Sequence, residues 1–171
     1  MADQRKVIEQ PGRVEGSQHI VEGESMPRVS TYLNFMGNTE EAFSFYREVF
    51  GGEFNDPISR MSDMPSDPSN PLPDAEKNMI MHIELPILGG HVLMGTDMLE
   101  SMGHTLRVGN NVTLNLELED RGETERLFGL LAEGSTEVAP LTDMPWGAYW
   151  GCCLDRFGIR WMFNCVATDE S

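Results

Sequence analysis

The chain repeats one pattern of secondary structure twice, and this repeat constrains the fold more than any other feature of the sequence. One amphipathic helix is predicted to begin at Asn38 and a second at Asp120, about 82 residues later. Each helix follows an alternating strand, over residues 29–36 and 112–118, and precedes three short strands. The sequence therefore predicts an α+β fold of two βαβββ modules, which form a curved, cleft-lined mixed sheet with helices on its outer face.

Capping residues and apolar stripes support both helices. Asn38 is expected to cap the first helix, and Asp120 with Glu123 forms a box-like capping pair at the second. Apolar side chains then recur at helical spacing: Ala42, Phe43, Tyr46, Val49 and Phe50 in the first helix, and Leu127, Phe128 and Leu131 in the second.

The remaining strands and loops complete the two modules. In the first module, strands are predicted over residues 54–61, 79–85 and 91–96, with Pro57 favouring an edge position for the first of them. Residues 62–76 hold four prolines and are predicted to be a loop long enough to act as a lid. In the second module, strands are predicted over residues 136–142, 148–154 and 160–166. The predicted domain spans residues 28–167, with modules at about 28–98 and 111–167. A flexible extension over residues 1–27 precedes it, and a tail over 168–171 follows it.

Composition excludes several classes of function. The 28 acidic and 12 basic residues give a net charge of −16, and such a surface repels nucleic-acid phosphates, so no nucleic-acid partner is expected. No stretch reaches the ~20 apolar residues that span a membrane, and the N-terminus lacks the apolar segment of a signal peptide. Three cysteines without zinc-ligand spacing indicate reduced thiols in a cytoplasmic protein.

Several motifs occur in a consistent order along the chain. They are Tyr32–Asn38, Glu41–Tyr46, Phe50–Gly52, Trp146-Gly, and the turn with its following strand, Asp155–Trp161. In this arrangement the chain resembles the PhnB-like branch of the vicinal-oxygen-chelate superfamily, which includes glyoxalase I, bleomycin-resistance proteins and extradiol dioxygenases. The resemblance implies a homodimer with a small-molecule ligand in its cleft. Some PhnB-like proteins carry a demethylubiquinone methyltransferase label, but no glycine-rich turn opens a helix after the first strand here.

The resemblance also locates the metal ligands of the metal-using members. The corresponding positions are Thr31, His82, Thr113 and Met162, of which only His82 is a good ligand for a divalent metal. No cofactor is therefore predicted. The alternative is a shifted metal site in which His82, Glu84 and Glu117 converge, with either glutamate as the base.

Three functions follow from this resemblance as expectations. The favoured one is a cleft that binds a small molecule without a metal; the others are a metal-dependent lyase, isomerase or dioxygenase, and a protein that sequesters a cationic drug. We expect the cleft to be lined by residues from both modules: Thr31, His82, Glu84, Thr113, Asn115, Glu117, Trp150 and Met162.

Overall fold

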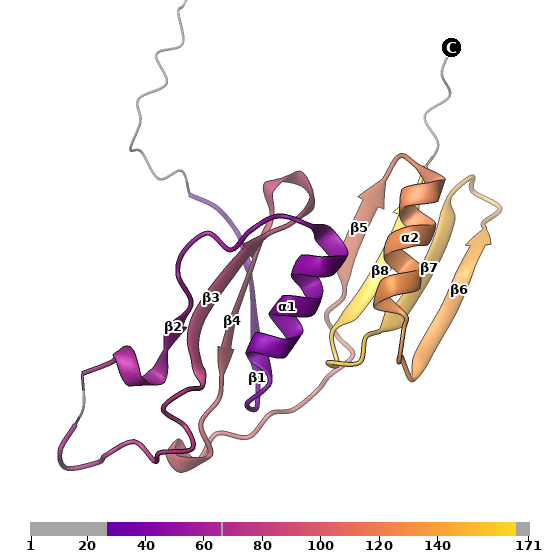
Figure 1. Ribbon diagram of the computed structural model, residues 1–171. Helices are drawn as coiled ribbons and strands as arrows, with labels where there is room; N and C mark the ends of the chain where they lie inside the picture. The colour runs from indigo at the N-terminus through magenta and orange to yellow at the C-terminus, as the bar shows by residue number, and fades with distance from the viewer. Residues whose placement is uncertain (1–26, 66, 167–171) are drawn as a thin grey trace, which may run out of the picture.

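The computed structural model describes residues 27–65 and 67–166, so the predicted N-terminal extension and most of the predicted tail lie outside the described residues. Two modules lie side by side, each with one helix across one face of its sheet (Figure 1). The first module contains β1 (Thr31–Phe35), α1 (Thr39–Phe50), β2 (Ser59–Arg60), β3 (Ile80–Pro86) and β4 (Val92–Asp97). The second contains β5 (Leu114–Leu118), α2 (Arg121–Leu131), β6 (Glu137–Asp143), β7 (Tyr149–Leu154) and β8 (Arg160–Cys165).

The two modules share one topology. Their strand orders are β1-β4-β3-β2 and β5-β8-β7-β6. The pairs β1–β4 and β5–β8 are parallel, and all other neighbouring strands are antiparallel. Hydrogen bonding stops at β1 and at β5, and these two edge strands run in opposite directions in Figure 1. We call the boundary between them the seam. The predicted pair of βαβββ modules in an α+β fold is confirmed.

Strand β2 is much shorter than predicted. The sequence indicates a strand over residues 54–61, but only Ser59–Arg60 pairs with β3. Pro57 lacks a backbone N–H and cannot take part in a regular ladder. The chain before it keeps one backbone hydrogen bond to β3, in which the Asn55 N–H donates to the Glu84 carbonyl at 3.1 Å.

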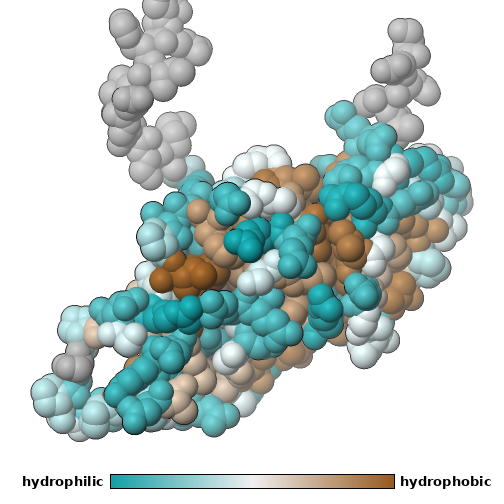
Figure 2. Space-filling view, in the orientation of Figure 1, coloured by the Kyte–Doolittle hydropathy of each residue, from teal (hydrophilic) through white to brown (hydrophobic). Residues whose placement is uncertain are grey.

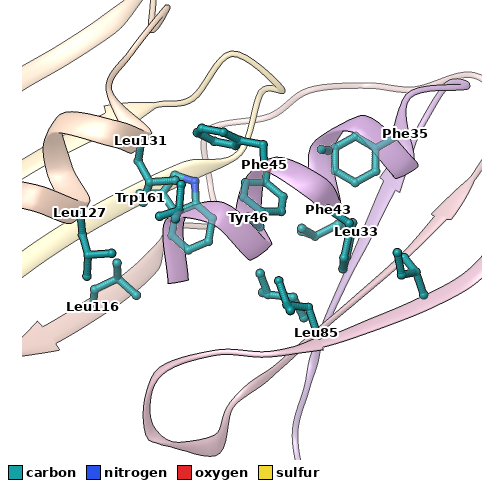
Figure 3. Close-up of a cluster of buried hydrophobic side chains, with 14 of the residues drawn as sticks. Leu33, Phe35, Phe43, Phe45, Tyr46, Leu85, Leu116, Leu127, Leu131 and Trp161 are labelled. Atoms are coloured by element: carbon teal, nitrogen blue, oxygen red, sulfur yellow. The ribbon is translucent and has the colours of Figure 1, made fainter. Parts of the chain in front are cut away.

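One hydrophobic core joins the modules. Its largest fully buried side chains come from both helices and both sheets, and Figure 3 shows Trp161 of β8 between Tyr46 of α1 and Leu131 of α2. The Tyr46 and Trp161 rings meet at 64° with centroids 5.7 Å apart, and the Phe50 ring also packs on Trp161, with centroids 5.5 Å apart. Since burying one such side chain contributes roughly 1.5–3 kcal/mol, this contact holds the modules together.

Asp155, at the turn between β7 and β8, anchors this core. Its buried carboxylate accepts hydrogen bonds from the Tyr46 hydroxyl and the Trp161 Nε1, both at 2.8 Å. It also accepts from the backbone N–H groups of Phe157 and Ile159, both at 2.9 Å. The tight turn expected at this position thus has a second role, because its first residue connects the second module to α1 of the first.

The two helices are capped in different ways. Asp120 Oδ1 accepts from the Glu123 N–H at 2.6 Å, as predicted. The Asn38 side chain makes no capping bond, contrary to the prediction. Asp97, at the end of β4, takes that role: its Oδ1 accepts from the Thr39 N–H at 3.1 Å and its Oδ2 from the Ile80 N–H at 2.8 Å. The helix start is therefore fixed by a strand 58 residues away.

The proline-rich segment is a loop, as predicted. Between Arg60 and Ile80 the described residues form a 3₁₀ turn, Met61–Asp63, and further turns but no strand. Its C-terminal end is held by Glu76, whose buried carboxylate accepts from the Ser101 N–H at 3.0 Å. Seen from the helix side, the surface is mostly hydrophilic with hydrophobic patches between (Figure 2). No helix among the described residues is long and apolar enough to cross a bilayer.

Candidate functional site

Alternation along the strands places core residues on one face of the sheets and most of the predicted site residues on the other. Leu33, Phe35, Leu116 and Phe163 point to the helices and are buried. The opposite, helix-free face carries Tyr32 of β1, His82 and Glu84 of β3, Asn115 and Glu117 of β5, Trp150 of β7 and Met162 of β8. Seven side chains from five strands thus share one face of the molecule, and six of them are predicted site residues.

The seam holds a pocket of about 360 Å³, which we call the seam pocket. This volume is within the roughly 300–1,000 Å³ of typical small-molecule sites. Four predicted cleft residues line it, and its other lining residues come from the segment before β4 and from the core: Thr31, Thr113, Asn115 and Glu117, then Ile87, Leu88, Gly89, His91, Leu114, Leu116 and Trp161. The pocket therefore combines polar groups of both modules with apolar walls.

Thr31 and His91 form the polar edge of the seam pocket in the first module. The Thr31 hydroxyl and His91 Nε2 lie 2.9 Å apart, and both residues are half-buried. Opposite them, the Asn115 amide donates to the Glu117 carboxylate at 3.2 Å, and both residues are exposed. These groups offer a ligand a hydroxyl, an imidazole, an amide and one negative charge.

His82 and Glu84 do not line the seam pocket but form a hydrogen-bonded chain with Tyr32. His82 Nε2 lies 3.1 Å from Glu84 Oε1, and His82 Nδ1 lies 3.1 Å from the Tyr32 hydroxyl. The pKa of Glu84 is lowered, first by the hydrogen bond from Asn55 and then by that from His82. An ionised Glu84 only accepts, so a neutral His82 carries its proton on Nε2 and accepts from Tyr32 at Nδ1.

Tyr32 is the exposed end of this chain. The residue is 47% exposed, so a ligand on the helix-free face can reach its hydroxyl. Partial burial raises the pKa of Tyr32, and the nearby charge of Glu84 raises it further. The phenol therefore stays protonated at neutral pH and is a hydrogen-bond donor.

The alternative metal site does not assemble. His82 and Glu84 lie on β3, while Glu117 lies on β5, so β4, β1 and the seam separate them. Residues 27–65 and 67–166 contain no group of three His, Cys, Asp or Glu side chains that could hold a metal ion.

Trp150 and Met162 belong to the helix-free face of the second module. In the sheet register Met162 is paired with Asn115 on one side and with Cys152 on the other, and Trp150 is paired with Asn164. Both side chains are half-buried. They add apolar surface beside the polar side chains of β5, and neither residue lines the seam pocket.

Sequence reasoning missed His91 and Tyr32. His91 was assigned to a strand, but it precedes β4 and turns toward β1, a tertiary contact that no local pattern indicates. Tyr32 had a usable signal, because it alternates with the core residues Leu33 and Phe35 and so must face away from α1.

Comparison with known proteins identifies relatives over most of the described region. A family model described as 3-demethylubiquinone-9 3-methyltransferase matches residues 27–163. Protein YjdN of Escherichia coli strain K12 is 28% identical over 145 residues, which cover 81% of this chain and 95% of YjdN.

Solved structures show the same fold. Protein PA1353 of Pseudomonas aeruginosa is 33% identical, with a TM-score of 0.70 over 84% of this chain and 100% of that one. A putative 3-demethylubiquinone-9 3-methyltransferase, PhnB protein, of Bacillus cereus is 24% identical, with a TM-score of 0.64 over 82% and 100%. A glyoxylase/bleomycin resistance protein/dioxygenase domain of Frankia is 12% identical, with a TM-score of 0.51 over 84% and 98%, a likeness of fold.

Proposed function

The chain belongs to the PhnB-like family described as 3-demethylubiquinone-9 3-methyltransferase, within the glyoxalase and bleomycin-resistance fold, and from this premise we propose that it binds a small molecule in the seam pocket without a metal ion. The observation that carries the proposal is the convergence of both modules on this pocket. Thr31 and His91 approach from one side and Thr113, Asn115 and Glu117 from the other. Concave sites with a few polar groups and apolar walls are the usual form of small-molecule sites.

The lining of the seam pocket favours a neutral or cationic polar ligand. Glu117 is its one charged residue among those described, and the hydroxyl, amide and imidazole groups can each donate or accept. Leu88 and Ile87 provide apolar contact at one end. An anionic ligand would meet the Glu117 carboxylate there.

Methyl transfer has weaker support than binding. The description of the family model and of the Bacillus cereus protein names a methyltransferase. In this chain β1 leads into α1 through Gly37-Asn38, and the N-terminus of α1 is occupied by the Asp97 carboxylate. That helix end is therefore closed to the anionic part of a nucleotide-type cofactor.

A second candidate is proton transfer by the chain Tyr32–His82–Glu84. In it a substrate acid would give its proton to Tyr32 as the Tyr32 proton passes to His82, whose positive charge Glu84 would stabilise. The carboxylate–imidazole–phenol geometry, with both contacts at 3.1 Å, favours this candidate over a metal-dependent reaction. Nitrogen-15 NMR of His82 tests the arrangement: Glu84→Gln should move the proton population from Nε2 toward Nδ1, and unchanged ring shifts would contradict it.

We also propose that the protein acts in the cytoplasm as a homodimer. Three free thiols, two of them buried, support a reducing compartment. Exposed apolar residues that one chain leaves uncovered support self-association: Val29, Val108, Val112, Val138 and Trp146. Light scattering after size-exclusion chromatography measures the mass, and a particle of 19.2 kDa at micromolar concentration would contradict the dimer.

A fragment screen followed by amide NMR tests the proposed binding. We expect neutral and cationic fragments to shift the signals of Thr113 and Asn115, and Thr113→Trp to abolish these shifts because an indole fills the pocket. Thr136→Trp is the matched control, since Thr136 is exposed on the loop before β6, and it should bind as the unmodified protein does. Retained binding in Thr113→Trp would contradict the assignment. A bulky cationic glycopeptide in the same screen tests drug sequestration, which predicts a thermal shift that weakens with salt.

A further inference from the structure

A second pocket lies at the other end of the seam, where three segments meet. Strand β1, the connection between the modules at residues 106–112 and the β7–β8 turn at residues 157–160 enclose about 270 Å³. Figure 1 shows this turn next to the connection. The pocket shares Thr31 and Leu114 with the seam pocket, but its other lining residues are different.

The charge of this second pocket is opposite to that of the whole protein. Arg107 and Arg160 line it, and none of the described lining residues is Asp or Glu. The chain has only 12 basic residues against 28 acidic ones, so two arginines in one hollow without a carboxylate are unexpected. Amide groups of Asn34 and Asn111 add neutral donors to the lining.

The guanidinium of Arg160 keeps unused donor capacity. Its Nη2 donates to Glu137 at 2.8 Å, and Glu137 lies outside this pocket with a side chain 58% exposed. Its Nε is the one buried side-chain nitrogen or oxygen without a hydrogen-bond partner among the described residues. The Arg160 guanidinium has five N–H donors, and Glu137 is its one hydrogen-bond partner among the described residues. Leaving a buried donor without a partner costs free energy, which favours a ligand acceptor at this position.

Arg107, in the connection between the modules, adds a second cation to the lining. It is exposed, and it makes no ion pair with the described part of the chain. The lining also includes the apolar residues Leu106, Val112, Phe157 and Ile159. A ligand that matches this lining carries an anionic group at one end and a compact apolar body at the other.

We infer that this second pocket, the arginine pocket, binds a small amphipathic carboxylate with an aromatic or short aliphatic body. Its volume of about 270 Å³ is slightly below the roughly 300–1,000 Å³ of typical ligand sites, which restricts the body to about one ring or six carbons. Carboxylates pair with arginine through two parallel hydrogen bonds, and Arg160 and Arg107 both offer such pairs of donors. The inference does not depend on the proposed function of the seam pocket, because the charged groups of the two pockets are different.

Titration of the complete chain with phenylacetate and hexanoate, followed by amide NMR, tests this inference. We expect saturable shifts in residues 106–112 and 157–160, and binding that weakens as sodium chloride rises from 50 to 500 mM. The neutral amides of the same two acids should bind at least tenfold more weakly, and hexylamine should not bind there. Equal binding of the amides or of hexylamine would overturn the inference.

Substitutions at the two arginines locate the site. Arg107→Gln removes one charge-assisted contact and should weaken phenylacetate binding by roughly ten- to a hundredfold. Because Arg107 is exposed, this substitution should leave the fold intact. Arg47→Gln is the control with the same charge change, because Arg47 lies over the Phe54 ring away from this pocket. Arg160→Lys keeps the charge but loses the paired donors, and should weaken binding several-fold.

Glu117→Gln separates the two pockets. It alters the seam pocket alone, so it should change phenylacetate binding less than twofold. If Arg107→Gln and Arg47→Gln weaken binding equally, or no shift occurs at 20 mM ligand, the arginine pocket is not a carboxylate site. Either result leaves the proposal for the seam pocket untouched, since that is tested with other fragments and with Thr113→Trp.

Discussion

Substitution of Asp155 by alanine should destabilise the protein more than any other change of a polar residue in the modules. Asp155 is 4% exposed, and Tyr46 and Trp161, whose side-chain donors it accepts, are both fully buried. Each orphaned buried donor costs about 1–3 kcal/mol. Two side-chain donors and two half-buried backbone N–H groups lose their partner, so we expect the free energy of unfolding to fall by about 3–5 kcal/mol.

Urea unfolding followed by tryptophan fluorescence measures this loss. A domain of this size has about 5–15 kcal/mol of stability in total, so the midpoint should move by a large fraction of its value. Asp155→Asn keeps the shape but presents an amide to at least one donor, and should cost about half as much. Asp143→Asn is the control, because its ion pair with Arg121 is exposed and worth about 1 kcal/mol or less. If Asp155→Ala cost less than 1 kcal/mol, the turn would not be the anchor between the modules.

Three other changes test the packing of the first module. Burial raises the pKa of Tyr46 well above its usual value, and Asp155 raises it further. The Tyr46 phenol therefore ionises first in the unfolded chain, so stability should hold below about pH 10 and fall above it. Tyr46→Phe should make that fall smaller in urea midpoints measured at pH 8 and pH 11. Asp97→Ala should cost about 2–4 kcal/mol and Asn38→Ala less than about 0.5 kcal/mol, since only Asp97 caps α1; equal losses by thermal unfolding would refute this. Gly95→Ala should destabilise by at least about 1–3 kcal/mol in the same assay because its Cβ would lie 2.3 Å from a Phe43 ring carbon, and unchanged stability would contradict that contact.

Local patterns were sufficient to predict the elements and their order. Period-two alternation located β5, and the apolar stripe from Ala42 to Phe50 located α1, because both patterns reflect the face that each element buries. The two failures have different causes, one local and one tertiary. Pro57 shortened β2, and Asp97 displaced Asn38 as the cap of α1, a tertiary contact between residues far apart in sequence.

The candidate site was predictable only in part. Thr31, Thr113, Asn115 and Glu117 do line one pocket, since they lie at the two edges that meet at the seam. His82 and Glu84 lie on the same face as expected, but strand order determines how far they are from Glu117, and single-strand patterns do not contain strand order.

Arg107 and Arg160 were not predicted at all. They lie in a loop and at the start of β8, and only the folded chain brings both to one hollow. Charge counted over the whole sequence concealed them, because a net value of −16 indicates cationic ligands in general. The electrostatics of a pocket depend on the few charges that line it rather than on the total.

A crystal structure of the protein with its tightest-binding neutral or cationic fragment tests the central claim most directly. The account predicts density between β1 and β5 that contacts Asn115 and Glu117 from the second module and Thr31 or His91 from the first, with no metal ion between ligand and protein. Density that rests on His82 and Glu84 through a bound metal ion would contradict it.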